Sequence, residues 1–224
     1  MESQNRLIHE FCGLKFQRLY SCIDPKNGES VESGILYDIN SVGDILEEIF
    51  GDYMCKRLEN FRRGPKQKSP DFFYEDTEIE LKVFRHSPGF DIGNYYSYIH
   101  NLSLPGGVKR KLLDTSYVIL EYDIEDSCII IKNYYIKKVW EIVSLTTKYP
   151  ISCQVKYTKI HNLRPTSSKT FKNVNSMEDF MKSVIDMIKM FPCEKSEEYI
   201  ESIEHQFNQL SDDWRRRHVP EQVV

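Results

Sequence analysis

The alternation of aliphatic and charged residues in one short segment restricts the fold of this chain more than any other feature. Ile79, Leu81 and Val83 alternate with Glu80 and Lys82. Because successive side chains of a β-strand point to opposite faces, the pattern predicts a strand with Glu80 and Lys82 on one face and the aliphatic residues on the other. We expect the aliphatic face to be buried against the rest of the protein.

Residues 70–85 are predicted to form a hairpin. If Glu75 and Asp76 make a two-residue loop, Asp71 lies directly opposite Glu80. Opposed residues have Cβ atoms about 4.5–5.5 Å apart, so two carboxylates there repel each other unless a cation lies between them. Glu-Asp is a poor sequence for a tight turn, but a four-residue loop keeps the same register. The pairing predicts a site for a cation that prefers oxygen ligands, such as Mg²⁺.

Lys82 lies on the same face of the predicted strand as Glu80. A lysine beside a metal ion can position an attacking water or stabilise the charge on a phosphate. Asp71, Glu80 and Lys82 together supply the groups that hydrolysis of a phosphodiester bond requires. A solvent-facing hairpin with ordinary surface residues shows the same alternation and remains the alternative.

The spacing of apolar residues along the rest of the chain predicts a mixed α/β protein. Residues 1–40 are predicted to form a helix followed by irregular structure. Further helices are expected from Ser41 to the break at Gly64-Pro65 and over residues 92–102, 135–143, 177–190 and 197–217. Strands are expected over residues 117–120, 128–131 and 151–160. No linker divides the chain, which predicts one domain over residues 1–224.

Composition and charge narrow the function classes. The net charge is -4, yet residues 149–177 contain no Asp or Glu, so a basic surface for nucleic acid can form locally. The six cysteines include no CxxC pair, which argues against a zinc site and a disulfide framework. No apolar run reaches the ~18 residues of a membrane span, and the polar N-terminus lacks the pattern of a signal peptide. We expect a cytoplasmic protein that does not enter a membrane.

The order Pro70-Asp71, eight residues, then Glu80-Leu81-Lys82 resembles the signature of the PD-(D/E)xK nuclease superfamily. Glu47, in the helix before the motif, resembles the acidic residue that many members carry near the metal. Residues 154–157 and 162–165 resemble a late strand and an Asn-Leu-Arg-Pro stretch in restriction enzymes of the NgoBV type. The similarity spans roughly residues 41–165. It implies a restriction-endonuclease-like core, with a mixed central β-sheet flanked by helices, followed by C-terminal helices over residues 176–217.

The resemblance also implies an activity and its residues. A type II restriction endonuclease hydrolyses specific double-stranded DNA with Mg²⁺, for which Mn²⁺ can substitute, and leaves 5′-phosphate ends. Asp71 and Glu80 would bind the metal, with the Leu81 carbonyl and Glu47 as further ligands, and Lys82 would serve the attacking water. DNA contacts are expected from Arg85, His86, Gln154, Lys156, Lys159 and Arg164. A palindromic target implies a homodimer, and a cognate DNA methyltransferase is expected in the same system.

Two other functions fit the same residues. One is a repair, recombination or phage nuclease of the same superfamily, and the other is a DNA-binding module without catalytic activity. The sequence also departs from the superfamily pattern at one point. No strand is recognisable between the helix that begins at Ser41 and the motif that begins at Pro70.

Overall fold

The computed structural model describes residues 8–12, 15–17, 20–23, 30–33, 39–66, 68–125, 128–146, 148–157, 159–168, 171 and 176–210. The chain divides into two compact units. The first comprises residues 1–86 and 116–136, and the second comprises residues 87–115 and 137–224. A single nuclease domain over residues 1–224 stays a prediction.

A six-stranded mixed sheet forms the centre of the first unit. Its strand order is β1 (Lys15–Gln17), β9 (Cys128–Lys137), β8 (Ser116–Glu125), β6 (Thr77–Phe84), β5 (Phe72–Tyr74) and β4 (Phe61–Arg63). Strands β6 and β8 are parallel, whereas β4, β5 and β6 pair antiparallel, as do β1 and β9. A separate hairpin consists of β2 (Tyr20–Ile23) and β3 (Ser30–Ser33).

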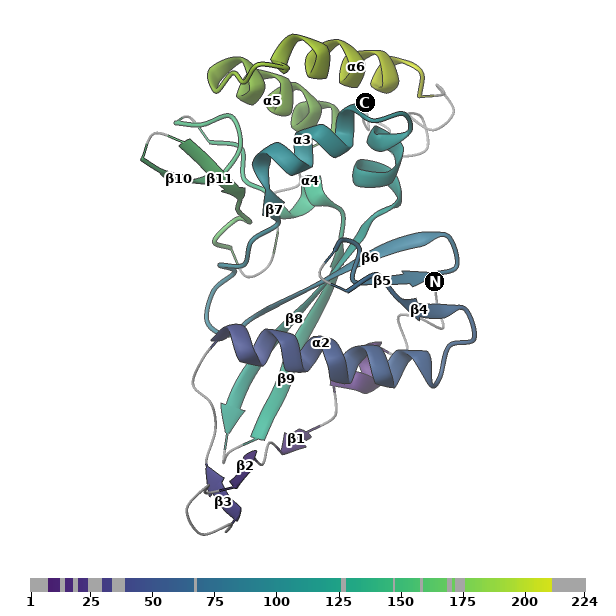
Figure 1. Cartoon of the computed structure of the whole chain (residues 1–224), viewed down its shortest axis with the longest axis vertical. Helices are drawn as coiled ribbons and strands as arrows, with labels where there is room; N and C mark the ends of the chain where they lie inside the picture. The colour runs from purple at the N-terminus through teal and green to yellow at the C-terminus, as the bar shows by residue number, and fades with distance from the viewer. Residues whose placement is uncertain are drawn as a thin grey trace, which may run out of the picture. The chain divides into compact units, whose positions relative to one another are not determined.

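Helix α2 (Ile39–Cys55) packs against one face of this sheet (Figure 1). Every fourth residue from Val42 onward is apolar and buried, which gives the helix one continuous apolar face. That face meets the aliphatic side of β6 and β8; the shared core contains Val42, Leu46, Phe50, Met54, Ile79, Leu81, Val118 and Leu120. Burial of each large apolar side chain contributes about 1.5–3 kcal/mol, so the alternation over residues 79–83 fixes which face of β6 turns inward.

The strand that the sequence did not reveal is β4. The helix predicted to run from Ser41 to Gly64 ends at Cys55, and Phe61–Arg63 pair with β5. Leu58 and Phe61 continue an apolar spacing that also fits a helix, and both are buried. A strand of three residues depends on its neighbour in the sheet rather than on its own pattern, which is why the helix prediction was wrong here.

Other boundaries differ from the sequence prediction. The helix expected over residues 135–143 is wrong for its first half, because β9 continues to Lys137 and only α4 (Val139–Ile142) is helical. The single strand expected over residues 151–160 is a hairpin of β10 (Cys153–Lys156) and β11 (Lys159–Leu163). The N-terminal forty residues contain the three strands β1 to β3 besides a helical turn at residues 8–12.

The second unit contains a small sheet of order β10–β11–β7, with β7 at Gly93–Asn94. Its helices are α3 (Tyr95–Ser103), the π-helical segment η1 (Lys109–Asp114), α4, α5 (Met177–Met190) and α6 (Ser196–Asn208). The first predicted C-terminal helix is confirmed by α5, and the second by α6 as far as Asn208; residues 211–217 lie outside the described part. Among the described residues, no helix has the length and apolarity to cross a membrane.

Candidate active site

The β5–β6 hairpin has the register that the sequence predicts. Tyr74 pairs with Thr77, and Phe72 pairs with Ile79. The next position places Asp71, just before β5, opposite Glu80. Asp71 is fixed there by a hydrogen bond from the Leu81 backbone N–H to its Oδ2, 2.7 Å long. The predicted convergence of the two acidic residues is therefore present in the structure.

The loop before Asp71 packs closely against the end of β4. The Gly64 N–H donates to the Asp71 carbonyl oxygen at 2.7 Å. A Cβ atom added at Gly64 would lie only 1.8 Å from the Pro70 carbonyl oxygen, so no larger residue fits without a backbone shift. Glycine at this position allows β4 to hold Asp71 from one side while β6 holds it from the other.

Glu80 is buried, with 6% of its surface exposed, and both of its carboxylate oxygens have partners. The Ser69 hydroxyl donates to Oε1, and the Lys82 ammonium lies 3.4 Å from Oε2. Lys82 and Glu80 share one face of β6, as the alternation predicts. The Lys82 ammonium partly neutralises the charge of the Glu80 carboxylate. The Asp71 carboxylate is held by a backbone N–H, which has no net charge to neutralise it.

Burial and mutual repulsion shift the acid–base properties of these groups. Burial, with a further contribution from the Glu80 charge, raises the pKa of Asp71 from 3.8 to about 7. Burial alone would lower the pKa of Lys82, but the nearby carboxylates outweigh it, and the pKa lies above its ordinary value of 10.5. Lys82 therefore carries its charge at neutral pH, whereas a second full negative charge in the site is unfavourable.

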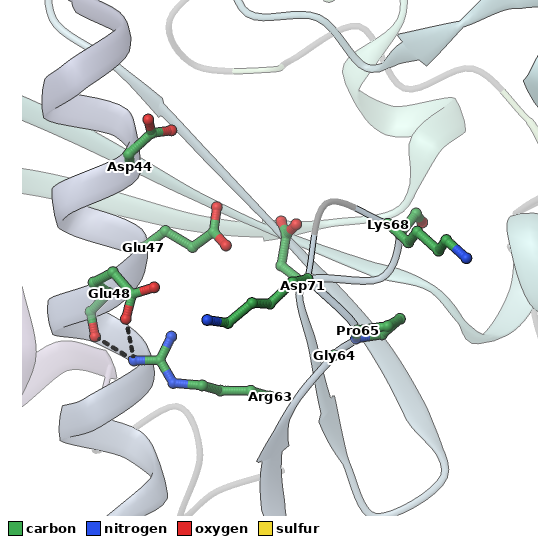
Figure 2. A pocket seen from close by; sticks show the side chains of 10 residues that line it. Asp44, Glu47, Glu48, Arg63, Gly64, Pro65, Lys68 and Asp71 are labelled. Atoms are coloured by element: carbon green, nitrogen blue, oxygen red, sulfur yellow. Dashed lines mark hydrogen bonds and ion pairs between the residues drawn. The ribbon is translucent and has the colours of Figure 1, made fainter.

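Glu47 joins the same group of charges from helix α2. Burial raises the pKa of Glu47, and its charge also interacts with those of Lys82 and Glu80. Figure 2 shows the Glu47 and Asp71 side chains extending from opposite sides into one cleft, whereas Glu48 turns to Arg63. Glu47 therefore faces the cleft, and its role as a metal ligand stays a prediction.

The cleft has a volume of about 580 Å³ and lies wholly within the first unit. Acidic side chains occupy the α2 side, and basic side chains come from the segment between β4 and β5. Its lining consists of Asp44, Glu47, Glu48, Arg63, Gly64, Pro65, Lys66, Lys68, Ser69 and Asp71. The cleft therefore combines carboxylates from α2 and Asp71 with the basic segment that precedes Asp71.

No three His, Cys, Asp or Glu side chains lie close enough to hold a metal ion by themselves in the described part of the chain. Mg²⁺ does not require such a set, because it commonly uses one or two carboxylates together with waters and substrate phosphates. The donors that converge here are the carboxylates of Asp71 and Glu80, with the Leu81 backbone between them. They fit a hard divalent cation in chemistry and number, and Glu47 adds a carboxylate across the cleft.

The residues predicted to contact DNA fall into two groups. Arg85 and Arg164 are held by the protein: Arg85 Nε lies 2.9 Å from Asp123, and Arg164 pairs with Asp91 at 3.1 Å and donates to the Gly89 carbonyl. Lys156, Lys159 and His86 are exposed, and Gln154 is half-buried. A role of any of them in DNA binding stays a prediction.

Sequence reasoning gave Ser69 no role at the site, and it did not place Lys66 and Lys68 beside the carboxylates. Ser69 donates to Glu80, and Lys66 and Lys68 line the cleft. Their signal was their position, because both lysines and the serine directly precede the Pro70-Asp71 pair. Both lysines belong to a basic stretch of the sequence, residues 56–68, but its place beside the carboxylates follows only from β4, which the sequence did not reveal.

Comparison with known proteins identifies the family. The sequence model described as NgoBV restriction endonuclease matches residues 32–217. The chain belongs to the NgoBV restriction endonuclease family. The match extends beyond both ends of the resemblance over residues 41–165. It confirms the predicted type II restriction endonuclease, a hydrolase that cuts DNA at specific sequences.

Two further comparisons, both with NlaIV, support the assignment. The type II restriction enzyme NlaIV of Neisseria lactamica is 30% identical over 166 residues, which cover 68% of this chain and 67% of that protein. A solved structure of NlaIV restriction endonuclease superposes with a TM-score of 0.74 at 22% identity, over 97% of this chain and 90% of the other. The structural likeness confirms the predicted fold class, a mixed central sheet with flanking helices.

Proposed function

We propose that this restriction endonuclease uses Asp71, Glu80 and Lys82 to hydrolyse phosphodiester bonds of double-stranded DNA with a divalent cation, Mg²⁺ being the physiological choice. The observation that carries the proposal is the meeting of two carboxylates and one ammonium on a single hairpin face beside an open cleft. The raised pKa of Asp71 supports it, because two buried anions favour a cation between them.

Asp71 and Glu80 would hold the cation, with the Leu81 carbonyl and Glu47 as further oxygen donors. When bound, the cation supplies Lewis-acid chemistry, which polarises the scissile phosphate and makes an attacking water more nucleophilic. The Leu81 N–H and the Ser69 hydroxyl keep the two carboxylates in place before substrate arrives. Manganese has similar ligand preferences and would substitute.

Lys82 would act directly on the reacting groups. Its ammonium can donate to a non-bridging phosphate oxygen or to the attacking water, and its positive charge opposes the negative charge that builds up in the transition state. Because the pKa of Lys82 is raised, it acts as a proton-bearing donor rather than as a base at neutral pH. Lys66 and Lys68 would hold the neighbouring phosphates of the strand in the cleft.

The remaining parts of the proposal concern the biological assembly. A homodimer would present two such sites to the two strands of a palindromic target, and cleavage would leave 5′-phosphate ends. A DNA methyltransferase of matching specificity would protect the host genome, and both enzymes would act in the cytoplasm, where that DNA lies. DNA contacts would come from His86, Gln154, Lys156 and Lys159, with Arg85 and Arg164 as further donors once they exchange partners.

Plasmid digestion tests the proposal. The purified protein should give discrete bands with Mg²⁺ or Mn²⁺ and none with EDTA, and the fragments should be joined by a ligase that requires 5′-phosphates. Lys82→Ala should lower the cleavage rate about 100- to 1,000-fold, the usual loss when one transition-state donor is removed. Lys132→Ala is the matched control, because Lys132 pairs with Glu125 on the same sheet.

Three outcomes would contradict parts of the proposal. Full activity in EDTA would exclude the cation. Cleavage by Lys82→Ala at the wild-type rate would exclude the assigned site, even if cutting depends on Mg²⁺. Fragments without discrete ends would point to a repair, recombination or phage nuclease, and binding without any cutting would point to a non-catalytic DNA-binding module.

A further inference from the structure

The hairpin of β10 and β11 carries two lysines in an unfavourable arrangement. Lys156 and Lys159 are paired directly across the two strands at the end of the hairpin, and both are exposed. Like charges at directly opposed positions destabilise a strand pair. Residues 149–177 contain no Asp or Glu that could neutralise the two ammonium groups locally. A negatively charged partner would attract both ammonium groups and offset the repulsion between them.

The residue next to this pair is an aromatic side chain in solvent. Tyr157 is 95% exposed, whereas the other exposed large apolar residues of the described chain lie between 37% and 50%. Its backbone has a φ of 49°, in the left-handed region that side chains with a Cβ adopt at a cost. Glycine and asparagine adopt this conformation at a lower energetic cost and are the usual residues at such a turn. Tyrosine at this position presents a large exposed ring beside the two lysines.

We infer that the β10–β11 hairpin is a DNA-binding wing, in which Lys156 and Lys159 contact phosphates and the Tyr157 ring packs against bases or sugars between them. This inference rests on the proposed action on DNA. Lysines neutralise backbone phosphates, and aromatic rings at exposed tips stack on bases or insert beside them. A protein partner fits less well, because lysine is depleted in protein–protein interfaces.

The base of the hairpin keeps the wing in place. Val155 pairs with Ile160, which is buried, and β11 pairs on its other side with β7 through Asn162 and Asn94. The Asn162 amide also donates to Asp91 at 2.7 Å. The hairpin is therefore tied to its own unit at one end, and Lys156, Tyr157 and Lys159 at the other end are exposed.

Variants at the hairpin end test the inference by fluorescence anisotropy. The probe is a short labelled duplex that spans a cleavage site mapped by plasmid digestion, kept uncut with EDTA. Tyr157→Gly should weaken binding at least about five-fold, whereas Tyr157→Phe, which keeps the ring, should bind like the wild type. Lys156→Ala with Lys159→Ala should reduce the slope of log affinity against log salt by about 1.8, since each phosphate contact contributes about 0.9.

Two controls separate DNA binding from folding. Lys182→Ala with Lys189→Ala removes two exposed lysines of α5 and should leave the salt slope unchanged. Tyr157→Gly should melt no lower than the wild type, because glycine adopts a positive φ without strain. If it melts lower, the ring supports the fold, and the double lysine variant then decides whether the hairpin contacts DNA.

The outcomes distinguish this inference from the proposed function. A wild-type protein that neither binds nor cuts DNA would overturn both. If the protein cuts DNA while its hairpin variants bind DNA like the α5 control, that result would overturn only the inference that the β10–β11 hairpin binds DNA. A change in the sedimentation of Tyr157→Gly without a change in DNA affinity would also overturn it, and would assign the hairpin to a protein interface.

Discussion

Replacing Asp71 with asparagine should stabilise the metal-free protein. The folded state raises the pKa of Asp71 from 3.8 to about 7. At about 1.4 kcal/mol per pH unit, the ionised carboxylate destabilises the folded protein by about 4 kcal/mol. Solvent that reaches the half-buried carboxyl group screens its charge, so we expect about half of this value, ~2 kcal/mol. The amide oxygen of the introduced asparagine can still accept the Leu81 N–H, so the substitution removes charge and keeps the hydrogen bond.

The stabilisation by Asp71→Asn should be larger at high pH than at low pH. A carboxyl group whose folded-state pKa is raised binds its proton more tightly in the folded protein, so the wild type has no penalty below pH ~4. The penalty grows as the pH rises from ~4 to ~7 and is complete above ~7. Asp71→Asn should therefore melt about 4–8 °C above the wild type at pH 8 and close to it at pH 4, given about 2–4 °C per kcal/mol for a chain of this length.

Thermal unfolding in EDTA across this pH range, followed by circular dichroism, measures the effect. Asp76→Asn is the matched control, because Asp76 is an exposed aspartate in the turn of the same hairpin. Addition of Mg²⁺ should raise the melting temperature of the wild type and not that of Asp71→Asn, since only a site with both carboxylates gains from the cation. Two results would refute the inferred cost of a charged Asp71 beside Glu80. One is an Asp71→Asn variant no more stable than the wild type at pH 8, and the other is a gain in melting temperature that is the same at every pH.

Three further substitutions test contacts within the two units. Gly64→Ala should cost at least ~2 kcal/mol of unfolding free energy and most of the cleavage rate, because its Cβ would lie 1.8 Å from the Pro70 oxygen; Gly43→Ala, with 3.7 Å to Val83, should be tolerated. Arg63→Ala should lower stability by about 1 kcal/mol in chemical denaturation, since its guanidinium joins β4 to the Glu48 carbonyl. Arg164→Ala should lower the melting temperature even without DNA, because Arg164 holds the Asp91 loop; an unchanged melting temperature would favour a role in DNA binding alone.

The register of the hairpin was predictable because local rules determine it. The alternation over residues 79–83 selects the buried face, and the position of the loop then fixes which residues oppose each other. The structure has the pairs Tyr74–Thr77 and Phe72–Ile79 that follow from this reasoning. Glu75 even adopts a φ of 52°, the left-handed conformation that a short turn imposes on a residue poorly suited to it.

The extent of β9 was not predictable, because contacts with distant residues determine it. Residues 135–143 have helical spacing, yet the strand continues to Lys137. The Tyr135 ring stacks on Phe84 with a centroid distance of 6.5 Å, and Asn133 donates to Glu121 at 2.8 Å. Such contacts are added by strand pairing across the sheet, and they override a weak local preference.

The difference between local rules and distant contacts also explains which residues of the site could be predicted from the sequence. Asp71, Glu80 and Lys82 lie on one hairpin, so spacing alone brings them together. Glu47 reaches them only because α2 packs on the sheet, and Lys66 and Lys68 reach the cleft only because β4 pairs with β5. The sequence could therefore suggest Glu47 by resemblance, but it could not place the two lysines that line the same cleft.

The charges of the cleft connect metal binding with DNA binding. Glu47, Asp71 and Glu80 carry more negative charge than Lys82 can neutralise, and a DNA phosphate brought beside them adds to the repulsion. Lys66 and Lys68 offset it only in part, because they lie on the exposed side of the cleft, where water screens their charge. A divalent cation between the carboxylates reverses the sign of the field at the point where the scissile phosphate must approach. On this reasoning the cation favours entry of the substrate as well as its cleavage, and Ca²⁺ should increase the affinity of the uncleaved complex above the affinity in EDTA.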